Sequence, residues 1–389
     1  MIRIHTVEAH FAKSSPTEQV TRTVVGGKGR MPKAEIGVSS RWSEGIRSVG
    51  LSLLRRAINV SLPLLWVMKD RSREPTVCVG FCLFKWKIKE YTNMEKKTVF
   101  TGAATALITP LTENGIDYAA FERLINWQID EGINALVVAG TTGEASTLSD
   151  DEHRDAIAFA AKVAKGRVPV IAGTGSNDTE YALDLTRCAC EAGADAVLSV
   201  TPYYNKATQK GLYQMYTRIA DVSTVPVILY NVPSRTGVNI APKTYEALAE
   251  HPNIVGIKEA NGDISKIVET MARVRGRLDL YSGNDDQIVP LMALGGKGVI
   301  SVLSNLLPRE TADLCNRFLK GDIAGAAEMQ CRYHRLIDAL FSEVNPIPVK
   351  AAMAAMGYCE DYLRLPLTSM EDDTRANLLD AMREVGINV

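Results

Sequence analysis

Short runs of consecutive apolar residues recur along the chain from residue 98 onward, separated by roughly 20 to 35 residues. Runs in which nearly every position is apolar are typical of strands that are buried on both faces of a parallel sheet. We therefore predict eight strands, at 103–108, 135–139, 168–172, 196–200, 227–230, 254–258, 278–282 and 298–302.

Most stretches between these strands place apolar residues at helical spacing, as in 121–129 and 157–164. The second is preceded by the sequence SDDE at 149–152, which is typical of a helix N-terminus. Eight strands that alternate with helices over about 220 residues predict an α/β fold, the (β/α)8 or TIM barrel, at 94–321. The alternative, a doubly wound open sheet, would have a glycine-rich turn after its first strand, which TPLT at 109–112 does not provide.

The pattern changes after about residue 322, where the strand-like runs end. Helical spacing continues at 324–341, 349–356 and 373–385. We therefore expect a small C-terminal helical domain at 322–389 after the barrel.

The first 93 residues differ from the rest in charge, with 16 Lys and Arg against 7 Asp and Glu, whereas the remainder has 28 against 38. A basic lead is typical of a nucleic-acid-binding arm or a targeting peptide. Its apolar stretch at 49–68, however, is interrupted by two arginines and a proline, so it fits neither a signal peptide nor a membrane span. We favour a third interpretation, in which 1–93 is an unstructured extension or a mis-assigned start ahead of Met94. We expect that deletion of residues 1–93 leaves activity intact. We also expect neither nucleic acid nor a membrane as a partner of the chain.

Seven cysteines and five histidines are scattered along the chain. Their spacing matches neither a paired C-x-x-C zinc site nor a disulfide framework with an even number of cysteines. We expect reduced thiols, a cytoplasmic location, and no metal or cofactor.

Lys258 closes the apolar run at 254–258. Burial at a strand end disfavours the ammonium and can lower a lysine pKa to about 7–8, at which a neutral amine can attack a ketone and form a Schiff base. The alternative is a lysine whose stem is buried and whose ammonium reaches solvent.

Other polar residues follow neighbouring predicted strands, and in a (β/α)8 barrel these strand ends meet at one face. The second strand is followed by GTTGE at 140–144, where two hydroxyls and free backbone N–H groups can form a nest for a carboxylate. Tyr204 lies in TPYYN, and Tyr230 and Arg235 lie in YNVPSRTG. Taken singly, the tyrosines can be packing residues and the arginine a loop salt bridge. Together with Lys258 they predict an active site.

The chain from about residue 97 to its end resembles the dihydrodipicolinate synthase family of pyruvate-dependent class I aldolases, to which N-acetylneuraminate lyases also belong. The motifs GTTGE, VTPYYN, YNVPSRTG, GIKEA, GVISV and NPIPVK occur in the family's order, and residues 1–93 have no counterpart. The resemblance implies a lyase of the diaminopimelate and lysine pathway that condenses pyruvate with L-aspartate semialdehyde. It also implies a homotetramer built from two tight dimers.

The resemblance assigns the Schiff base to Lys258 and the pyruvate carboxylate to Thr141 and Thr142. It assigns proton transfer to Tyr230, linked through the Thr141 hydroxyl to Tyr204. The family donates this last tyrosine across the tight-dimer interface.

The second substrate is assigned through Arg235, whose planar guanidinium suits a carboxylate. Sialate lyases lack this arginine, so we favour the semialdehyde, with a sialate or sugar-acid lyase as the alternative. Gly283 and Ile300 match positions that line the family's site through backbone groups. A metal-dependent aldolase is disfavoured, because no His and carboxylate cluster lies at the strand ends. A catalytically idle, pyruvate-binding regulator would be expected to lack Lys258 or Tyr230, and both are present.

A possible effector site is the least complete of these matches. Lysine-inhibited members carry two histidines, an asparagine and a glutamate there. This chain matches at His153 and Asn177 but has Asp150 in place of one histidine and Tyr181 in place of the glutamate. The resemblance therefore does not predict inhibition by lysine.

Overall fold

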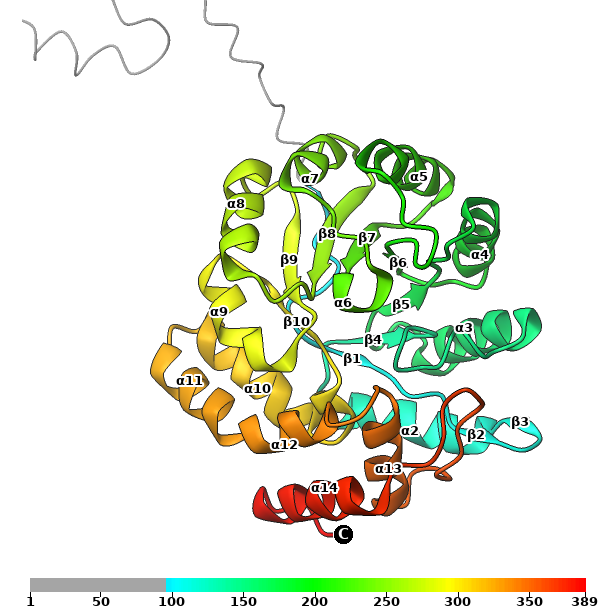
Figure 1. Ribbon diagram of the computed structural model, residues 1–389, viewed down its shortest axis with the longest axis vertical. Helices are drawn as coiled ribbons and strands as arrows, with labels where there is room; N and C mark the ends of the chain where they lie inside the picture. The colour runs from blue at the N-terminus through cyan, green and yellow to red at the C-terminus, as the bar shows by residue number, and fades with distance from the viewer. Residues whose placement is uncertain (1–95) are drawn as a thin grey trace, which may run out of the picture. The chain divides into compact units, whose positions relative to one another are not determined.

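The computed structural model describes residues 96–389, so the predicted extension at 1–93 and the start at Met94 lie outside the described residues. Within them, eight parallel strands close into a barrel in which β1 pairs with both β10 and β4 (Figure 1). The strands are β1 (Gly102–Ala106), β4 (Ala135–Val138), β5 (Val170–Gly173), β6 (Ala196–Val200), β7 (Val227–Asn231), β8 (Ile254–Glu259), β9 (Asp279–Ser282) and β10 (Gly298–Ser301). All eight predicted strands are confirmed, with ends that differ by at most two residues.

Most side chains of the strands pack into two cores, one inside the barrel and one between the barrel and its helices, while Leu280 of β9 joins a smaller cluster with Ile267 and Leu291. On β7, Ile228 and Tyr230 belong to the inner core, whereas Val227 and Leu229 belong to the outer one. Both faces are thus buried, which explains why the strands read as continuous apolar runs. Tyr230 pairs in register with Lys258 of β8, so both side chains point to the same side of the sheet.

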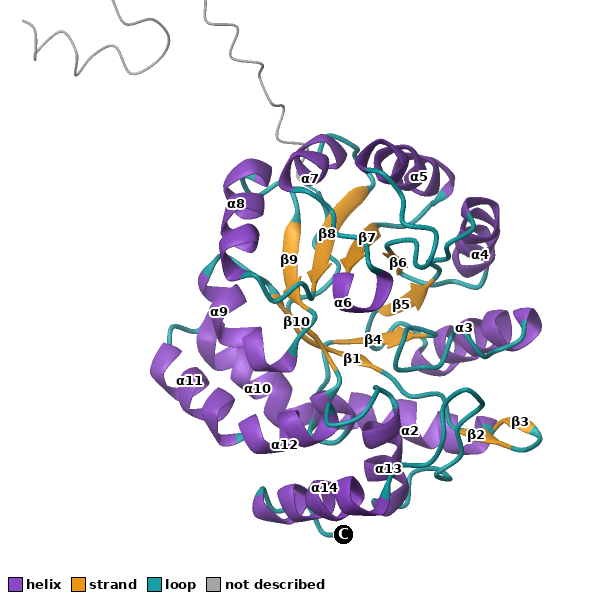
Figure 2. Cartoon of the chain, viewed as in Figure 1, coloured by secondary structure: helices purple, strands orange, loops and turns teal. Residues whose placement is uncertain are grey.

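Helices surround the barrel, as the purple elements of Figure 2 show. They are α2 (Tyr118–Asp130), α3 (Asp150–Ala164), α4 (Thr179–Glu191), α5 (Gln209–Val222), α6 (Pro233–Thr236), α7 (Pro242–Leu248), α8 (Ile264–Val274), α9 (Ile288–Ala293) and α10 (Pro308–Leu319). Two 3-10 turns, η1 (Asp285–Gln287) and η2 (Leu303–Asn305), and a hairpin of β2 (Leu111–Thr112) and β3 (Gly115–Ile116) complete this part. The predicted start of α3 is confirmed, because Ser149 and Glu152 form a reciprocal capping box.

Four helices follow the barrel, namely α11 (Ile323–Arg332), α12 (His334–Leu340), α13 (Ile347–Ala355) and α14 (Asp372–Glu384). The single helix predicted at 324–341 is wrong, because the chain breaks at Tyr333 into α11 and α12. The break lets α11 pack against α9 and α10 while α12 packs against α14 (Figure 1). The C-terminal helices are confirmed, and the domain boundary at 321/322 stays a prediction. No helix within residues 96–389 has the length and apolar character needed to cross a membrane.

Candidate active site

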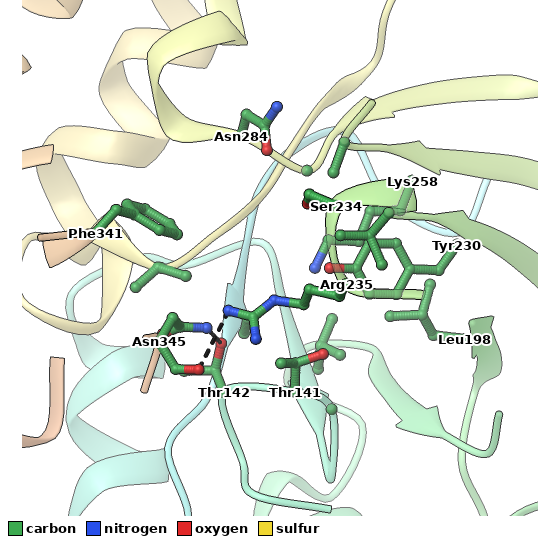
Figure 3. A pocket seen from close by; sticks show the side chains of 17 residues that line it. Thr141, Thr142, Leu198, Tyr230, Ser234, Arg235, Lys258, Asn284, Phe341 and Asn345 are labelled. Carbon is green, nitrogen blue, oxygen red and sulfur yellow. Dashed lines mark hydrogen bonds between the residues drawn. The ribbon is translucent and has the colours of Figure 1, made fainter. Parts of the chain in front are cut away.

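A cavity of about 170 Å³ opens at the carboxyl ends of the barrel strands (Figure 3). Its walls come from strand ends, from the loops that follow them and from the segment before α13. The lining residues are Ala106, Val137, Gly140, Thr141, Thr142, Leu198, Tyr230, Val232, Ser234, Arg235, Lys258, Ala260, Gly283, Asn284, Val302, Phe341 and Asn345. Six of the predicted site residues therefore meet in one cavity.

Lys258 projects from β8 into this cavity and is only 6% exposed. Its Nζ lies 4.3 Å from the centroid of the Tyr230 ring, which Figure 3 shows alongside it. Burial lowers the Lys258 pKa to about 7; the negative charge of Asp285 opposes this shift and the positive charge of Arg235 adds to it. The amine is therefore substantially neutral near pH 7, as a lysine nucleophile requires.

Tyr230 lies near the end of β7, opposite Lys258 in the pairing of β7 with β8, and is 7% exposed. Burial raises the pKa of its phenol, an effect opposed by the positive charge of Arg235 and by a hydrogen bond with the Thr141 side chain. The phenol is thus protonated near neutral pH and lies beside the Lys258 amine. It is well placed to transfer a proton to or from a group bound there.

The turn that follows β4 presents Thr141 and Thr142 to the cavity. Within the described residues, no hydrogen bond uses the backbone N–H of either threonine, so both donors are available to a carboxylate. Gly143 allows the tight turn, because a Cβ there would lie 3.1 Å from the Thr109 hydroxyl and 3.2 Å from the Leu107 carbonyl oxygen.

Arg235 reaches the mouth of the cavity from α6, a helix of one turn that begins at Pro233. Its guanidinium donates a hydrogen bond to the backbone oxygen of Asn345 over 3.2 Å. Two groups that are able to bind a carboxylate, the Thr141–Thr142 turn and Arg235, therefore line one cavity with Lys258 and Tyr230 (Figure 3). Suppose that a carbonyl compound forms an adduct with the Lys258 amine. This arrangement can then bind one carboxylate group at each end of that adduct.

The remaining predicted site residues differ in whether they line the cavity. Gly283 lines the cavity, and a Cβ on it would come within 3.2 Å of Lys258 Cε. Ile300 is fully buried in the inner core and does not line the cavity. Tyr204 does not line the cavity of its own chain either, and it is 90% exposed.

Of the predicted effector residues, His153 lies on α3 and Asn177 in the loop before α4, and neither lines the cavity. His153 is buried, with Nε2 2.7 Å from the Gly173 oxygen, and burial lowers its pKa. The Asn177 backbone oxygen accepts a hydrogen bond from the Asn205 amide. Nearby, Tyr181 donates a hydrogen bond to Asp150 over 2.7 Å, so the two residues that differ from the lysine-inhibited pattern bond each other.

The lining residues that were not predicted from the sequence include Asn284, Phe341 and Asn345. Asn284 and Phe341 carry no local signal of function. Asn345 opens the NPIPVK motif, which could have pointed to it. Its amide donates to the Thr142 hydroxyl over 3.0 Å, which ties the C-terminal segment to the turn. Across residues 96–389, no group of three or more His, Cys, Asp or Glu is arranged to hold a metal ion.

Comparison with known proteins agrees with this geometry. A 4-hydroxy-tetrahydrodipicolinate synthase of Alkaliphilus oremlandii is 52% identical over 289 residues, spanning 74% of this chain and 100% of the relative. One of Lachnoclostridium phytofermentans is 53% identical over 291 residues, spanning 74% and 99%. The crystal structure of a dihydrodipicolinate synthase from Acinetobacter baumannii, complexed with pyruvate, matches with a TM-score of 0.73 at 44% identity, covering 75% of this chain and 100% of that one. Residues 99–385 match the dihydrodipicolinate synthetase family, and the chain therefore belongs to that family.

Proposed function

We propose that this chain is a lyase that condenses pyruvate with L-aspartate 4-semialdehyde through a Schiff base on Lys258, the first committed step toward diaminopimelate and lysine. The observation that carries the proposal is a buried amine with a pKa of about 7 that faces a cavity beside a phenol. The relatives' names and the two carboxylate-binding groups in the cavity support the same substrates.

The reaction begins when the Lys258 amine attacks the ketone carbon of pyruvate. Loss of the ketone oxygen as water leaves an imine, which is protonated to an iminium. The iminium draws electrons from the methyl group, so a methyl proton is lost and an enamine forms. Its carbon then bonds to the aldehyde carbon of the second substrate, and the aldehyde oxygen takes up a proton as a hydroxyl. Finally the substrate's own amine adds to the imine carbon and releases Lys258 as the ring closes.

Each proton transfer requires an acid or base within hydrogen-bond reach of the adduct. We assign this role to Tyr230, with Thr141 as its hydrogen-bond partner and Tyr204 of a second subunit as the next group in the relay. The backbone and hydroxyl of Thr141 and Thr142 bind the pyruvate carboxylate. Gly283 keeps room beside Lys258 Cε, which a larger residue would fill.

We assign the second substrate's carboxylate to Arg235. A guanidinium can bind a carboxylate through two parallel hydrogen bonds, and Arg235 stands at the mouth where the second substrate must enter. A sialate or sugar-acid lyase, the alternative, would need hydroxyl partners at this position instead.

We also propose that the working enzyme is a cytoplasmic homotetramer of two tight dimers. The support for the dimer is Tyr204, which is too exposed to serve its own cavity and is free to enter a neighbouring one.

The test is to treat the full chain with pyruvate and sodium borohydride and to locate the reduced adduct by mass spectrometry. We expect one pyruvate-derived adduct, on Lys258, and its loss in the Lys258→Met variant. The control is Lys320→Met, which removes an exposed lysine at the end of α10 and should trap as the wild type does. An adduct elsewhere, or none, would overturn the Schiff-base mechanism.

Turnover assays then separate the two second substrates. We expect turnover with aspartate semialdehyde and none with N-acetylneuraminate. The opposite result would favour the sugar-acid lyase, while leaving the Schiff base on Lys258 in place.

A further inference from the structure

A buried ion pair lies behind the carboxylate-binding turn and outside the cavity. Lys350 of α13 donates to Glu144, the last residue of GTTGE, and their side chains are 0% and 1% exposed. A buried ion pair contributes little net stability compared with apolar residues of similar volume, but removing one partner leaves an unpaired buried charge. Stability alone therefore gives little reason for two charges at this position.

The backbone of Glu144 belongs to the turn itself. Its N–H donates to the Thr141 oxygen over 3.1 Å, and the next N–H, of Ala145, donates to the Gly140 oxygen over 3.2 Å. Glu144 has a φ of 56° and Ala139, at the other end of the turn, has a φ of 52°. Both lie in the left-handed region that side-chain-bearing residues rarely adopt, and such conformations persist only where surrounding contacts hold them.

The contacts that hold Glu144 come from the C-terminal segment. Besides the bond from Lys350, the Arg364 N–H lies 3.4 Å from the second carboxylate oxygen. The Arg364 guanidinium also donates to the Thr147 oxygen over 2.9 Å and pairs with Glu152 at the start of α3. The carboxylate and the loop after it are thus held from the same side.

A second contact runs from the start of α13 to the cavity wall. Asn345 donates to the Thr142 hydroxyl over 3.0 Å and accepts from Arg235 over 3.2 Å. Helix α13 begins two residues later, at Ile347, and carries Lys350 on its first turn. One short segment of the C-terminal part therefore contacts the turn at Thr142 and at Glu144.

We infer that Lys350 and Glu144 are positioning residues that hold the Thr141–Thr142 turn in the geometry that binds the carboxylate of the first substrate. The inference rests on the proposed function, in which this turn binds the pyruvate carboxylate. Neither residue lines the cavity, and both act through the backbone that Glu144 shares with Thr141.

The experiment compares pyruvate trapping by borohydride in the wild type, in Lys350→Met and in the double variant Lys350→Met with Glu144→Gln. We expect Lys350→Met to raise the half-saturating pyruvate concentration at least tenfold. The pH dependence of trapping, which Lys258 sets, should not change. The double variant removes the unpaired charge, so its thermal midpoint should return toward the wild type. Its half-saturating concentration should stay raised at least fivefold.

The control for stability is Leu378→Ala. Leu378 is fully buried on α14, so this variant should lower the thermal midpoint without touching the turn or the cavity. Its half-saturating pyruvate concentration should equal that of the wild type.

Two results would overturn the inference. The first is a half-saturating pyruvate concentration that is raised in Leu378→Ala as much as in the double variant. The second is a double variant that recovers both the thermal midpoint and the half-saturating pyruvate concentration of the wild type. Should Lys350→Met fail to fold, the double variant still decides between these outcomes. Absence of trapping in the wild type would overturn the proposed function instead.

Discussion

At the scale of single residues, the reactivity of this site comes from burial. Lys258 and Tyr230 are neighbours in the β7–β8 ladder, and both are nearly excluded from solvent. The same loss of hydration lowers the pKa of the amine and raises that of the phenol, because in each case it disfavours the charged form. Near pH 7 about half of the amine therefore has a free lone pair, while the phenol keeps its proton.

The pH dependence of pyruvate capture should follow the Lys258 amine. With a pKa of about 7, the neutral fraction and hence the initial rate of borohydride trapping should rise roughly tenfold between pH 6 and pH 8 and then level off. Peptide mapping across this range measures the rate at Lys258 itself. A rate that keeps rising past pH 9 would mean that the amine has an ordinary lysine pKa.

Replacing the phenol should separate proton transfer from folding. Tyr230→Phe is expected to lower kcat about 10²- to 10⁴-fold, the usual contribution of a general acid–base, with little change in thermal midpoint. Tyr281→Phe is the matched control: Tyr281 is also buried in the inner core and donates to the Phe100 oxygen over 2.8 Å, but it does not line the cavity. Equal losses of kcat in the two variants would assign Tyr230 a packing role.

At the scale of elements, the residues that follow Tyr230 and Lys258 join β7 and β8 on the outer side. Asn231 and Glu259 pair in register, and the Asn231 amide donates to the Glu259 carboxylate over 2.9 Å. Tyr245 of α7 donates to the other carboxylate oxygen over 3.0 Å. Burial raises the Glu259 pKa to about 7, although the hydrogen bonds from Asn231, Tyr245 and the Asn261 N–H oppose the shift.

Glu259 should therefore make stability depend on pH. An acid with a higher pKa in the folded than in the unfolded state binds its proton more tightly when folded, so its contribution is fully present below pH 4.5 and is lost as the pH rises toward 7. Glu259→Gln mimics the protonated acid. Between pH 5 and pH 8, its free energy of unfolding should gain about 3 kcal/mol relative to the wild type. Urea unfolding at several pH values measures the difference, and a constant difference would rule out titration of Glu259.

At the scale of the whole molecule, the cavity draws on parts of the chain that are far apart in sequence. The hydrogen bond between Asn345 and Thr142 joins residues 203 positions apart, and the bond between Lys350 and Glu144 joins residues 206 apart. The segment between α12 and α13 thus completes the wall of a cavity that Lys258 enters from the barrel. Tyr204, by contrast, is 90% exposed and does not line the cavity of its own chain.

The exposed Tyr204 leads to a complementation test of the proposed dimer. Lys258→Met and Tyr204→Phe should each be nearly inactive alone, but a mixed dimer has one site with an intact Lys258 and an intact Tyr204 donated by its neighbour. Co-expression from two tagged copies should therefore restore activity to about a quarter of the wild type after random pairing. No gain over the separate variants would mean that Tyr204 does not act across an interface.

Much of the fold could be read from local sequence. Eight apolar runs predicted the barrel strands to within two residues, because strands buried on both faces need apolar side chains at every position. The break at Tyr333 was missed, since both halves of 324–341 keep helical spacing and only their separate packing partners require a bend.

The sequence by itself determined the barrel and the meeting of Lys258, Tyr230, Thr141 and Arg235 at one face of it, because strand ends of a (β/α)8 barrel converge whatever the details of packing. Tertiary structure alone decided how deeply Lys258 is buried and which C-terminal residues reach the turn. The second depends on contacts between segments about 200 residues apart, such as Asn345 with Thr142, and no periodicity in either segment encodes its partner.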